Sequence, residues 1–359
     1  MGKAFKKFAT SQLFVPVFAL FLLIVFNLIR DIGFFEITYK NNTLQGNVMS
    51  ILNNASERVI LAIGMTLVTA SSRGQDISVG AVAAIAGSVF IRVLRENEIT
   101  IPIILVAFLA GCLVALICGV FNGTLVAGFR IQPMIASLIL FSAGRSIAYW
   151  INGGATPTVE SPLLGYIGGF IPGVPINTPI LIVIIFCVLI WLLLRFTTLG
   201  LYTQAVGINE RSARLNGINA PWIKLLSFMI LGICCAFAGA IGVSRIGLMN
   251  HDTFLQDIEL DAILAVALGG NVLGGGKFSL AGSVIGAYTI QTLTTTLFAM
   301  KVPSTAITVY KAIVIIIIVV IGSPVVKAYA IHLRDKLFKK PVNAKLDEKT
   351  DENNGELTI

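Results

Sequence analysis

Five long stretches of apolar residues without a charged side chain constrain the fold of this chain more than any other feature. A helix that crosses a lipid bilayer needs about 20 mostly apolar residues. One buried core helix would explain one such stretch, but not five. The chain is 56% hydrophobic and 12% charged, which is about half the charged fraction of a soluble domain. The sequence therefore predicts an all-α, polytopic membrane helical bundle, whose clearest segments are 13–29, 101–129, 178–194, 225–244 and 278–300.

The placement of the 26 Lys and Arg residues, which outnumber the 18 Asp and Glu residues, indicates a membrane protein rather than a nucleic-acid-binding one. They gather in residues 1–12, in a loop at about 195–224 and in the tail from 327. Cytoplasmic loops of membrane proteins carry such an excess of basic residues. We therefore expect a cytoplasmic N-terminus (1–12), a transmembrane domain (13–326) with a cytoplasmic loop at 195–224, and a cytoplasmic, basic and disordered tail (327–359).

Two pairs of apolar segments are short or interrupted. In the first pair, the segments 59–70 and 79–91 flank a polar stretch. In the second pair, the segment 262–276 ends in a glycine-rich stretch just before the segment 278–300 begins. Transporters place such broken or re-entrant helices near the translocation site, although two short tilted spans joined by a turn explain the first pair equally well. The first apolar segment lacks a small-residue cleavage pattern and is expected to stay as a span. Counting every segment predicts about ten, with both termini cytoplasmic; re-entrant segments would reduce the number to eight.

The residues that metal or covalent chemistry requires are scarce. The five cysteines lie within apolar segments at no metal-ligand spacing, so we expect them to pack without a disulfide or a metal. His251 and Asp252 lie in a polar stretch that we place outside, where they suit a docking loop or a solvated one. The sequence has no phosphate-binding loop of the Gly-x-x-x-x-Gly-Lys-Ser/Thr type. We therefore expect no cofactor and no enzyme activity in this chain.

Four segments in this order resemble one family. LAIGMTLV (61–68) leads to GQDISVG (74–80), IQP (131–133) precedes AGR (143–145), AVGINE (205–210) continues to NGIN (216–219), and ELDAILAV (259–266) leads to LGG (268–270). Together they resemble the ribose-type family of sugar ABC-importer permeases over about 51–322, and most of all its galactofuranose-type members. One departure stands out: Arg73-Gly74-Gln75 precedes Asp76, where the family usually has two glycines and an isoleucine.

The resemblance implies a permease subunit in the bacterial cytoplasmic (inner) membrane that imports a neutral monosaccharide, ribose- or galactofuranose-like. It also implies three kinds of partner: a cytosolic ABC ATPase, an extracytoplasmic sugar-binding protein, and a second copy or a related permease in a dimer, all in contact with membrane lipid. Two alternatives stay open. A branched-chain amino-acid ABC permease should favour compensating charges in its path, and a secondary transporter would usually show paired intramembrane acids, whereas Asp76 is nearly alone.

Polar side chains inside the apolar segments are the candidates for a translocation pathway or gate. A carboxylate such as Asp76 is costly near the membrane interior, but it could also cap the next helix or pair with Arg73. Uncharged polar side chains suit a hydroxyl-rich solute, and they equally suit hydrogen bonds between helices. The candidates are Gln75, Asp76, Asn122, Gln132, Asn271, Gln291 and Thr294.

Two basic residues in apolar segments have competing interpretations. Arg145 either lies on a pathway or pairs locally, or its side chain extends toward the membrane interface. Lys311 has no Asp or Glu within the neighbouring apolar segment, so we expect its side chain to extend outward rather than to serve in ion coupling.

The loop at 202–219 is expected to dock in a groove of the ATPase. Asn209 suits a helix N-cap, Ser212 to Leu215 can form one or two turns, and Gly217 suits a helix stop. Small Ala213 would permit close approach, and Leu215 would offer an apolar contact. The alternative is a basic loop that faces anionic lipid. The candidate coupling residues are Gly207, Asn209, Glu210, Ala213, Leu215 and Gly217.

Overall fold

The computed structural model describes residues 13–40 and 42–322, which fall into two units divided between Ile313 and Val314. The terminal segments that the sequence assigns to the cytoplasm, 1–12 and 327–359, lie outside the described residues. The described part contains fourteen α-helices, so the prediction of a helical protein is confirmed. Four of these helices are long and apolar enough to cross a membrane, and a fifth span arises if the bent pair α3 and α4 counts as one. The expected total of ten spans stays a prediction.

The elements follow one another along the chain with short connections, apart from the long segments around α8 and before α13. A 3-10 turn (Ile32–Phe35) and a hairpin of β1 (Thr38–Lys40) and β2 (Thr43–Gln45) precede α3. The helices are α2 (Phe14–Arg30), α3 (Asn47–Asn54), α4 (Ser56–Ser72), α5 (Val79–Arg95), α6 (Ile101–Ala127), α7 (Pro133–Ile151), α8 (Pro162–Gly168), α9 (Thr178–Phe196), α10 (Leu199–Ile208), α11 (Glu210–Leu215), α12 (Ala220–Ile246), α13 (Ile258–Leu268), α14 (Leu280–Ala299) and α15 (Ser304–Gly322).

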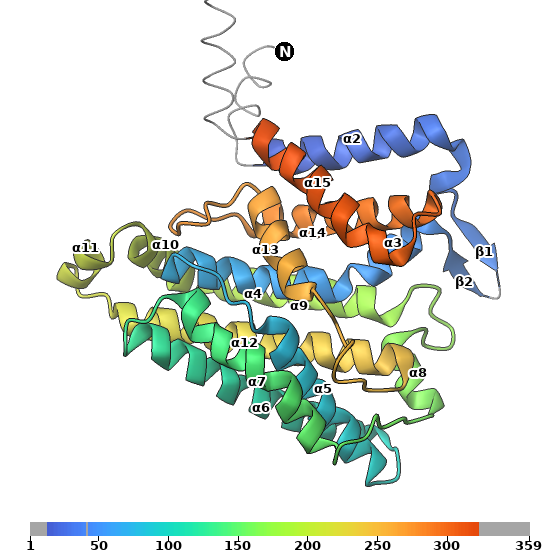
Figure 1. The fold of residues 1–359 in the computed structure, drawn as a ribbon, viewed down its shortest axis with the longest axis horizontal. Coiled ribbons are helices and arrows are strands. Elements are labelled where there is room, and N and C mark those ends of the chain that lie inside the picture. The colour runs from blue at the N-terminus through green and yellow to red at the C-terminus, as the bar shows by residue number, and fades with distance from the viewer. Residues whose placement is uncertain (1–12, 41, 323–359) are drawn as a thin grey trace, which may run out of the picture. The chain divides into compact units, whose positions relative to one another are not determined.

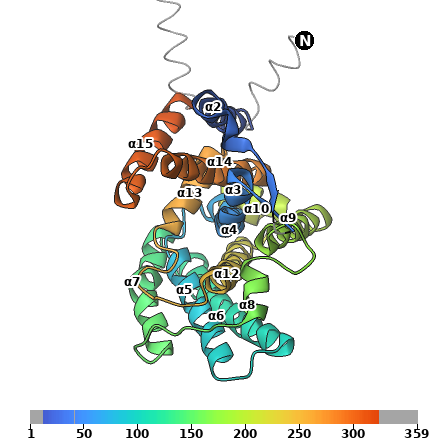
Figure 2. The same cartoon turned by 90° about the vertical axis from the view of Figure 1, so that its right-hand side faces the viewer.

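The core of the first unit is built around α12, which lies beside α4, α5 and α6 (Figure 2). Small residues allow these helices to approach closely. A Cβ atom added at Gly232 would lie 2.4 Å from the carbonyl oxygen of Ala115, and one added at Gly239 would lie 2.6 Å from that of Ala83. Backbone therefore packs directly on backbone along α12.

The two ends of the first unit carry different loops. Figure 1 shows α11 at one end and the β1–β2 hairpin at the other. At the hairpin end, the loops 152–177 and 247–257 pair through Val159 N donating to Gly247 O (2.7 Å) and Met249 N donating to Pro157 O (3.0 Å). The two loops therefore meet at one end of the bundle.

The second interrupted pair differs from its prediction. Instead of the expected segment 262–276, the structure has a shorter helix, α13, which begins at Ile258 and ends at Leu268. A non-helical, glycine-rich loop (269–279) separates α13 from α14. Glu259 and Asp261 lie in the first turn of α13 and are buried. This part of the polar stretch folds back into the bundle, where Asp261 pairs with two basic side chains.

Candidate functional site

The loop between α4 and α5 is held by a buried polar cluster. Asp76 Oδ1 accepts hydrogen bonds from the backbone N (2.8 Å) and Oγ (2.6 Å) of Ser78, and Asp76 Oδ2 accepts one from Asn122 Nδ2 (3.0 Å). Asp76 is 4% exposed and Asn122 is 1% exposed. A short polar side chain that accepts from the backbone two residues on stabilises a turn. Asp76 thus fixes the turn that begins α5, and it does not pair with Arg73.

Arg73 instead binds the end of a distant helix. Its Nε donates to Gly207 O (2.7 Å) and its Nη2 donates to Ile208 O (2.5 Å). These carbonyls end α10, and the last carbonyls of a helix lack partners inside the helix and favour a cation. Arg73 has a φ of 60° and ends α4 in the left-handed region. The only sequence signal for this contact is the departure from the family pattern at Arg73.

Gly207 touches α4 directly. A Cβ atom added there would lie 1.8 Å from the carbonyl oxygen of Ala70 and 2.5 Å from the backbone nitrogen of Gly276. The Gly276 N–H donates to the same Ala70 oxygen (3.0 Å), and Gln75 Nε2 donates to Leu273 O (3.1 Å). The end of α4 with its loop, the end of α10, and the glycine-rich loop 269–279 therefore form one contact region, which we call the three-segment junction.

Asn271 organises the glycine-rich loop of this junction. Its Nδ2 donates to Val266 O (3.1 Å) and to Ser283 Oγ (2.8 Å), and its Oδ1 accepts from Ser279 N (2.6 Å). The Ser283 hydroxyl also shares a 2.6 Å hydrogen bond with the hydroxyl of Thr66 in α4. A continuous polar network therefore ties the loop to α4 and α14.

The other predicted pathway residues lie elsewhere. Gln132 is exposed at the start of α7. Gln291 and Thr294 are buried within α14, where Gln291 Nε2 donates to Thr295 Oγ1 (3.2 Å) and the Thr294 hydroxyl donates to Ile290 O (2.9 Å). The structure therefore places Gln75 and Asn271 at the junction. Asp76 lies in the loop next to it, where Asn122 of α6 binds Asp76. The seven candidates do not all line one cavity.

The short helix that the sequence predicts at Ser212 to Leu215 is present as α11. Asn209 Oδ1 accepts from Ser212 N (3.0 Å), which confirms the N-cap, and Gly217 has a φ of 81°, which suits glycine after the helix end. Ala213 is 5% exposed and packs against its own chain, whereas Leu215 is 84% exposed. The free face of α11 therefore carries Leu215 rather than Ala213.

Glu210 ties α11 to α12. It pairs with Arg214 at 2.5 Å and with Lys224 of α12 at 2.6 Å. Partial burial works against the charged form of Glu210, but the hydrogen bonds and charges of Lys224 and Arg214 outweigh it and lower the pKa of this carboxyl. The N-terminal position of Glu210 in α11 also favours a negative charge.

Charged side chains of α4, α7 and α15 hold distant segments of the chain together. Asp261 is 2% exposed and pairs with Arg58 (2.8 Å) and Lys311 (2.5 Å). The apolar segment next to Lys311 contains no acidic residue, but the fold supplies one from α13, 50 residues away. Arg145 Nη1 donates to the carbonyl oxygens of His251, Asp252 and Phe254 and so holds that loop against α7.

Metal-binding and nucleophilic groups are not clustered in the part of the chain that the structure describes. It contains no group of three or more His, Cys, Asp or Glu side chains able to hold a metal ion, and the five cysteines are free thiols. The chemistry of the described residues is that of hydrogen bonds, ion pairs and close backbone packing.

Apolar helices long enough to cross a membrane, and interrupted segments that meet inside the bundle, together define a helical multi-pass membrane protein. A family model described as "Branched-chain amino acid transport system / permease component" matches residues 47–322, and the chain belongs to this family.

Relatives with assigned functions cover most of this chain. It is 38% identical to the galactofuranose transporter permease protein of Escherichia coli K12 over 85% of this chain and 88% of the relative. It is 34% identical to the fructose import permease protein of Bifidobacterium longum, over 92% and 93%. It is also 34% identical to the ribose import permease protein of Escherichia coli K12, over 77% and 85%. No solved structure gives a significant match.

Proposed function

We propose that this chain is the transmembrane subunit of an ATP-driven importer that carries a neutral monosaccharide into the cytoplasm. One observation carries the proposal: relatives aligned over most of both chains are permeases named for galactofuranose, fructose and ribose. Buried polar side chains without charge, such as Asn122, Asn271 and Gln291, agree with a solute of this kind.

Energy comes from a separate cytosolic ATPase, because the sequence lacks a phosphate-binding loop. The other partners are an extracytoplasmic binding protein that delivers the sugar and a second permease, either a copy of this chain or a relative. The importer lies in the cytoplasmic membrane of a bacterium, with its exposed apolar faces against lipid and both termini in the cytoplasm.

The loop 195–224 couples the permease to the ATPase through α11. The exposed Leu215 enters an apolar part of the ATPase groove, and the exposed Arg211 and Arg214 contact its polar rim. Movement of α11 passes to α10 and from there to α4 and the glycine-rich loop, since Arg73 and Gly207 join these segments. In this scheme the three-segment junction opens and closes the cytoplasmic end of the sugar path.

Uptake by the reconstituted complex tests the function. The permease is placed in liposomes with its ATPase and binding protein, and uptake of labelled ribose, fructose and galactose is measured with and without internal ATP. We expect ATP-dependent uptake of at least one sugar that excess unlabelled sugar blocks and leucine does not. Uptake that needs a proton gradient but no ATPase, or uptake that leucine blocks, would refute the proposal.

Labelling tests the orientation separately. A cysteine placed at Asn209, in a variant that lacks the five native cysteines, should react with a membrane-impermeant maleimide only after the membrane is opened. A cysteine placed at Asn97, in the loop between α5 and α6, should react in intact cells. Reaction of the cysteine at 209 from outside would overturn the assigned orientation.

A further inference from the structure

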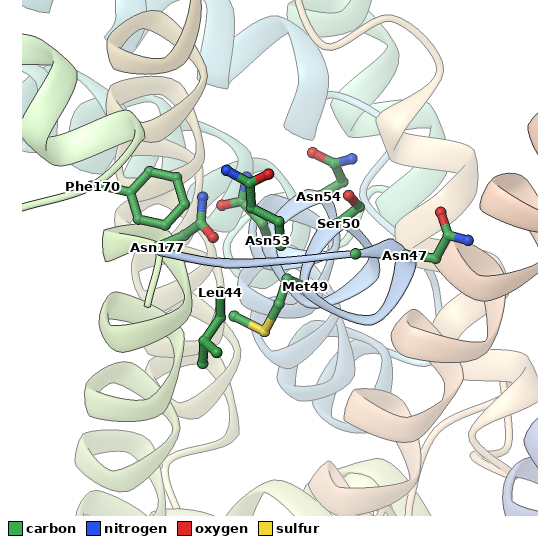
Figure 3. Close-up of a pocket in the computed structure, with 10 residues that line it drawn as sticks. Leu44, Asn47, Met49, Ser50, Asn53, Asn54, Phe170 and Asn177 are labelled. Carbon is green, nitrogen blue, oxygen red and sulfur yellow. The ribbon is translucent and has the colours of Figure 1, made fainter. Parts of the chain in front are cut away.

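A cavity of about 460 Å³ lies at the end of the first unit that carries the hairpin. Its walls come from three segments: β2 with the following turn, α3, and the segment 170–177 that leads into α9. Figure 3 shows side-chain amides around this cavity and the ring of Phe170 at its side. Five of the lining residues carry a side-chain amide, and none carries a charge: Gln45, Asn47, Asn53, Asn54 and Asn177.

This lining matches the surface of a sugar. A side-chain amide offers both donors and an acceptor, and each hydroxyl of a sugar can likewise donate and accept. The apolar side chains of Leu44, Met49 and Phe170 supply contacts for the C–H face of a sugar ring. Small-molecule sites combine these two features and have volumes of about 300–1,000 Å³. The lining has no charged side chain that would pair with the charges of an amino acid, so it suits a neutral sugar better.

Some of these amides have partners and others do not. Asn47 Nδ2 donates to Phe34 O (3.1 Å), and Gln45 Nε2 donates to Thr43 Oγ1 (3.2 Å). In contrast, Asn53 Oδ1 is a buried acceptor with no hydrogen-bond partner among the described residues. A buried polar atom normally has a partner. A turn of the Asn53 side chain toward the cavity would bring this acceptor to a ligand, which could then supply the missing partner.

The walls of the cavity are fixed to one another. Leu44 N donates to Pro175 O (2.9 Å), which joins the hairpin to the segment 170–177. Phe170 and Asn177 form an antiparallel bridge that closes this segment into a loop. The backbone oxygen of Asn53 accepts from Arg245 Nη2 (2.9 Å), which holds α3 against α12. A cavity with fixed walls can present its amides in one arrangement to a ligand.

We propose that this cavity binds the neutral monosaccharide as it enters the permease, with Asn53 and Asn177 hydrogen-bonded to its hydroxyls and Phe170 against its ring. The proposal rests on the proposed function and adds a site to it. α3 continues into α4 at a bend of 41°, and α4 ends at the three-segment junction. The two consecutive helices α3 and α4 therefore connect the sugar site at one end of the bundle to the proposed coupling contacts at the other end (Figure 1).

The test uses the complete complex in liposomes and the probes ribose, fructose and galactose. For each sugar that the wild type transports, Asn53→Ala and Asn177→Ala should raise the KM of uptake about tenfold, as expected for a lost hydrogen bond or two. The maximal rate and the basal ATPase rate should change little. Asn97→Ala is the matched control, because the exposed Asn97 amide lies in another loop and donates to Val93 O.

A direct measurement covers the case in which a variant folds poorly. Phe170→Trp keeps an aromatic face at the cavity, and its emission should change when ribose, fructose or galactose is added. The change should disappear when Asn53→Ala is added to this variant. An unaltered KM in both alanine variants, or a fall in maximal rate alone, would refute the site while leaving the proposed function standing. A wild type that imports none of the sugars would refute both.

Discussion

α4 and α9 both cross the bundle, but they are built in opposite ways. Fifteen of the seventeen residues of α4 are buried, and they include Gly64, Thr66 and Ser71. Only five of the nineteen residues of α9 are buried, and its surface carries large apolar side chains such as Ile185 and Trp191. The more apolar helix is therefore the more exposed one, which reverses the rule for a protein in water.

The difference follows from the solvent. Lipid does not drive apolar side chains together, so helices associate through close packing and hydrogen bonds between small and polar residues. Gly64 shows the first mechanism, since an added Cβ atom would lie 2.7 Å from Cys234 Sγ. The hydrogen bond between the hydroxyls of Thr66 and Ser283 shows the second. Close backbone contacts and hydrogen bonds between helices therefore gather on the less apolar helix, α4, and they include its contact with α10.

The largest effect on sugar uptake is expected when the contact of α10 with α4 is disturbed, compared with the contact of α10 with α9. Gly207 faces Ala70 of α4, whereas an added Cβ atom at Gly200 meets only Leu194 of α9, at 3.6 Å or more. Gly207→Ala should lower sugar uptake by at least about tenfold because the junction must open to admit a methyl group. Gly200→Ala should retain uptake.

Uptake and ATPase activity are measured together in liposomes for this pair. If the junction couples the two subunits, Gly207→Ala keeps basal ATP hydrolysis but loses its stimulation by loaded binding protein. Equal uptake by the two variants would show that contact between α10 and α4 does not carry the coupling.

The next effect concerns the ion pairs of α4. Asp261→Asn leaves Arg58 and Lys311 without their buried counter-charge, and loss of one partner from a buried pair costs about 3–5 kcal/mol. We expect a marked fall in the midpoint of thermal denaturation in lipid nanodiscs. Glu96→Gln is the control, since the Arg92–Glu96 pair is exposed and worth about 0–1 kcal/mol. Equal midpoints for both variants would contradict a structural role for Asp261.

A smaller effect on stability should distinguish α4 from α9 through side-chain packing alone. Ile63 of α4 is 1% exposed, and Ile185 of α9 is 59% exposed. Ile63→Ala should destabilise by about 2 kcal/mol or more through the cavity that it leaves, while Ile185→Ala loses only contacts with lipid. Denaturation of both variants in nanodiscs measures the difference. A larger loss at Ile185 would mean that a partner chain covers α9 in the assembly.

The comparison also explains what the sequence could predict. Runs of apolar residues predicted the exposed helices α6 and α9 within two residues of their ends, and the buried helix α12 within five residues of its ends. Local signals likewise predicted the N-cap of Asn209 and the turn at Gly217. Contacts between distant segments left no such signal. The pairing of Lys311 with Asp261 and the binding of Arg73 to the end of α10 depend on how helices approach, which a pattern along one chain does not encode.

The smallest effect is expected at α11, which is tied to the buried helix α12 rather than to a lipid-facing one. Lys224 and Arg214 lower the pKa of Glu210 below its ordinary value of 4.5. A lowered pKa in the folded state means that the charged carboxylate stabilises that state. This contribution is complete above the pKa of the unfolded chain and is lost as the pH falls through the folded-state pKa. Wild type should therefore be more stable than Glu210→Gln at pH 7, and the difference should vanish under acid conditions.

Salt and exposure limit the size of this effect. Glu210 keeps about a third of its side-chain surface exposed, so water and ions screen the pairs, and we expect a shift of about 1–2 °C in Tm. Thermal denaturation of both proteins, from pH 7 down to a pH at which Glu210 is protonated in the folded state, measures it at low and high salt. Arg92→Gln, at an exposed pair in α5, controls for a general loss of charge. If the difference between wild type and Glu210→Gln grew as the pH fell, the ion pairs would not be what holds α11 against α12.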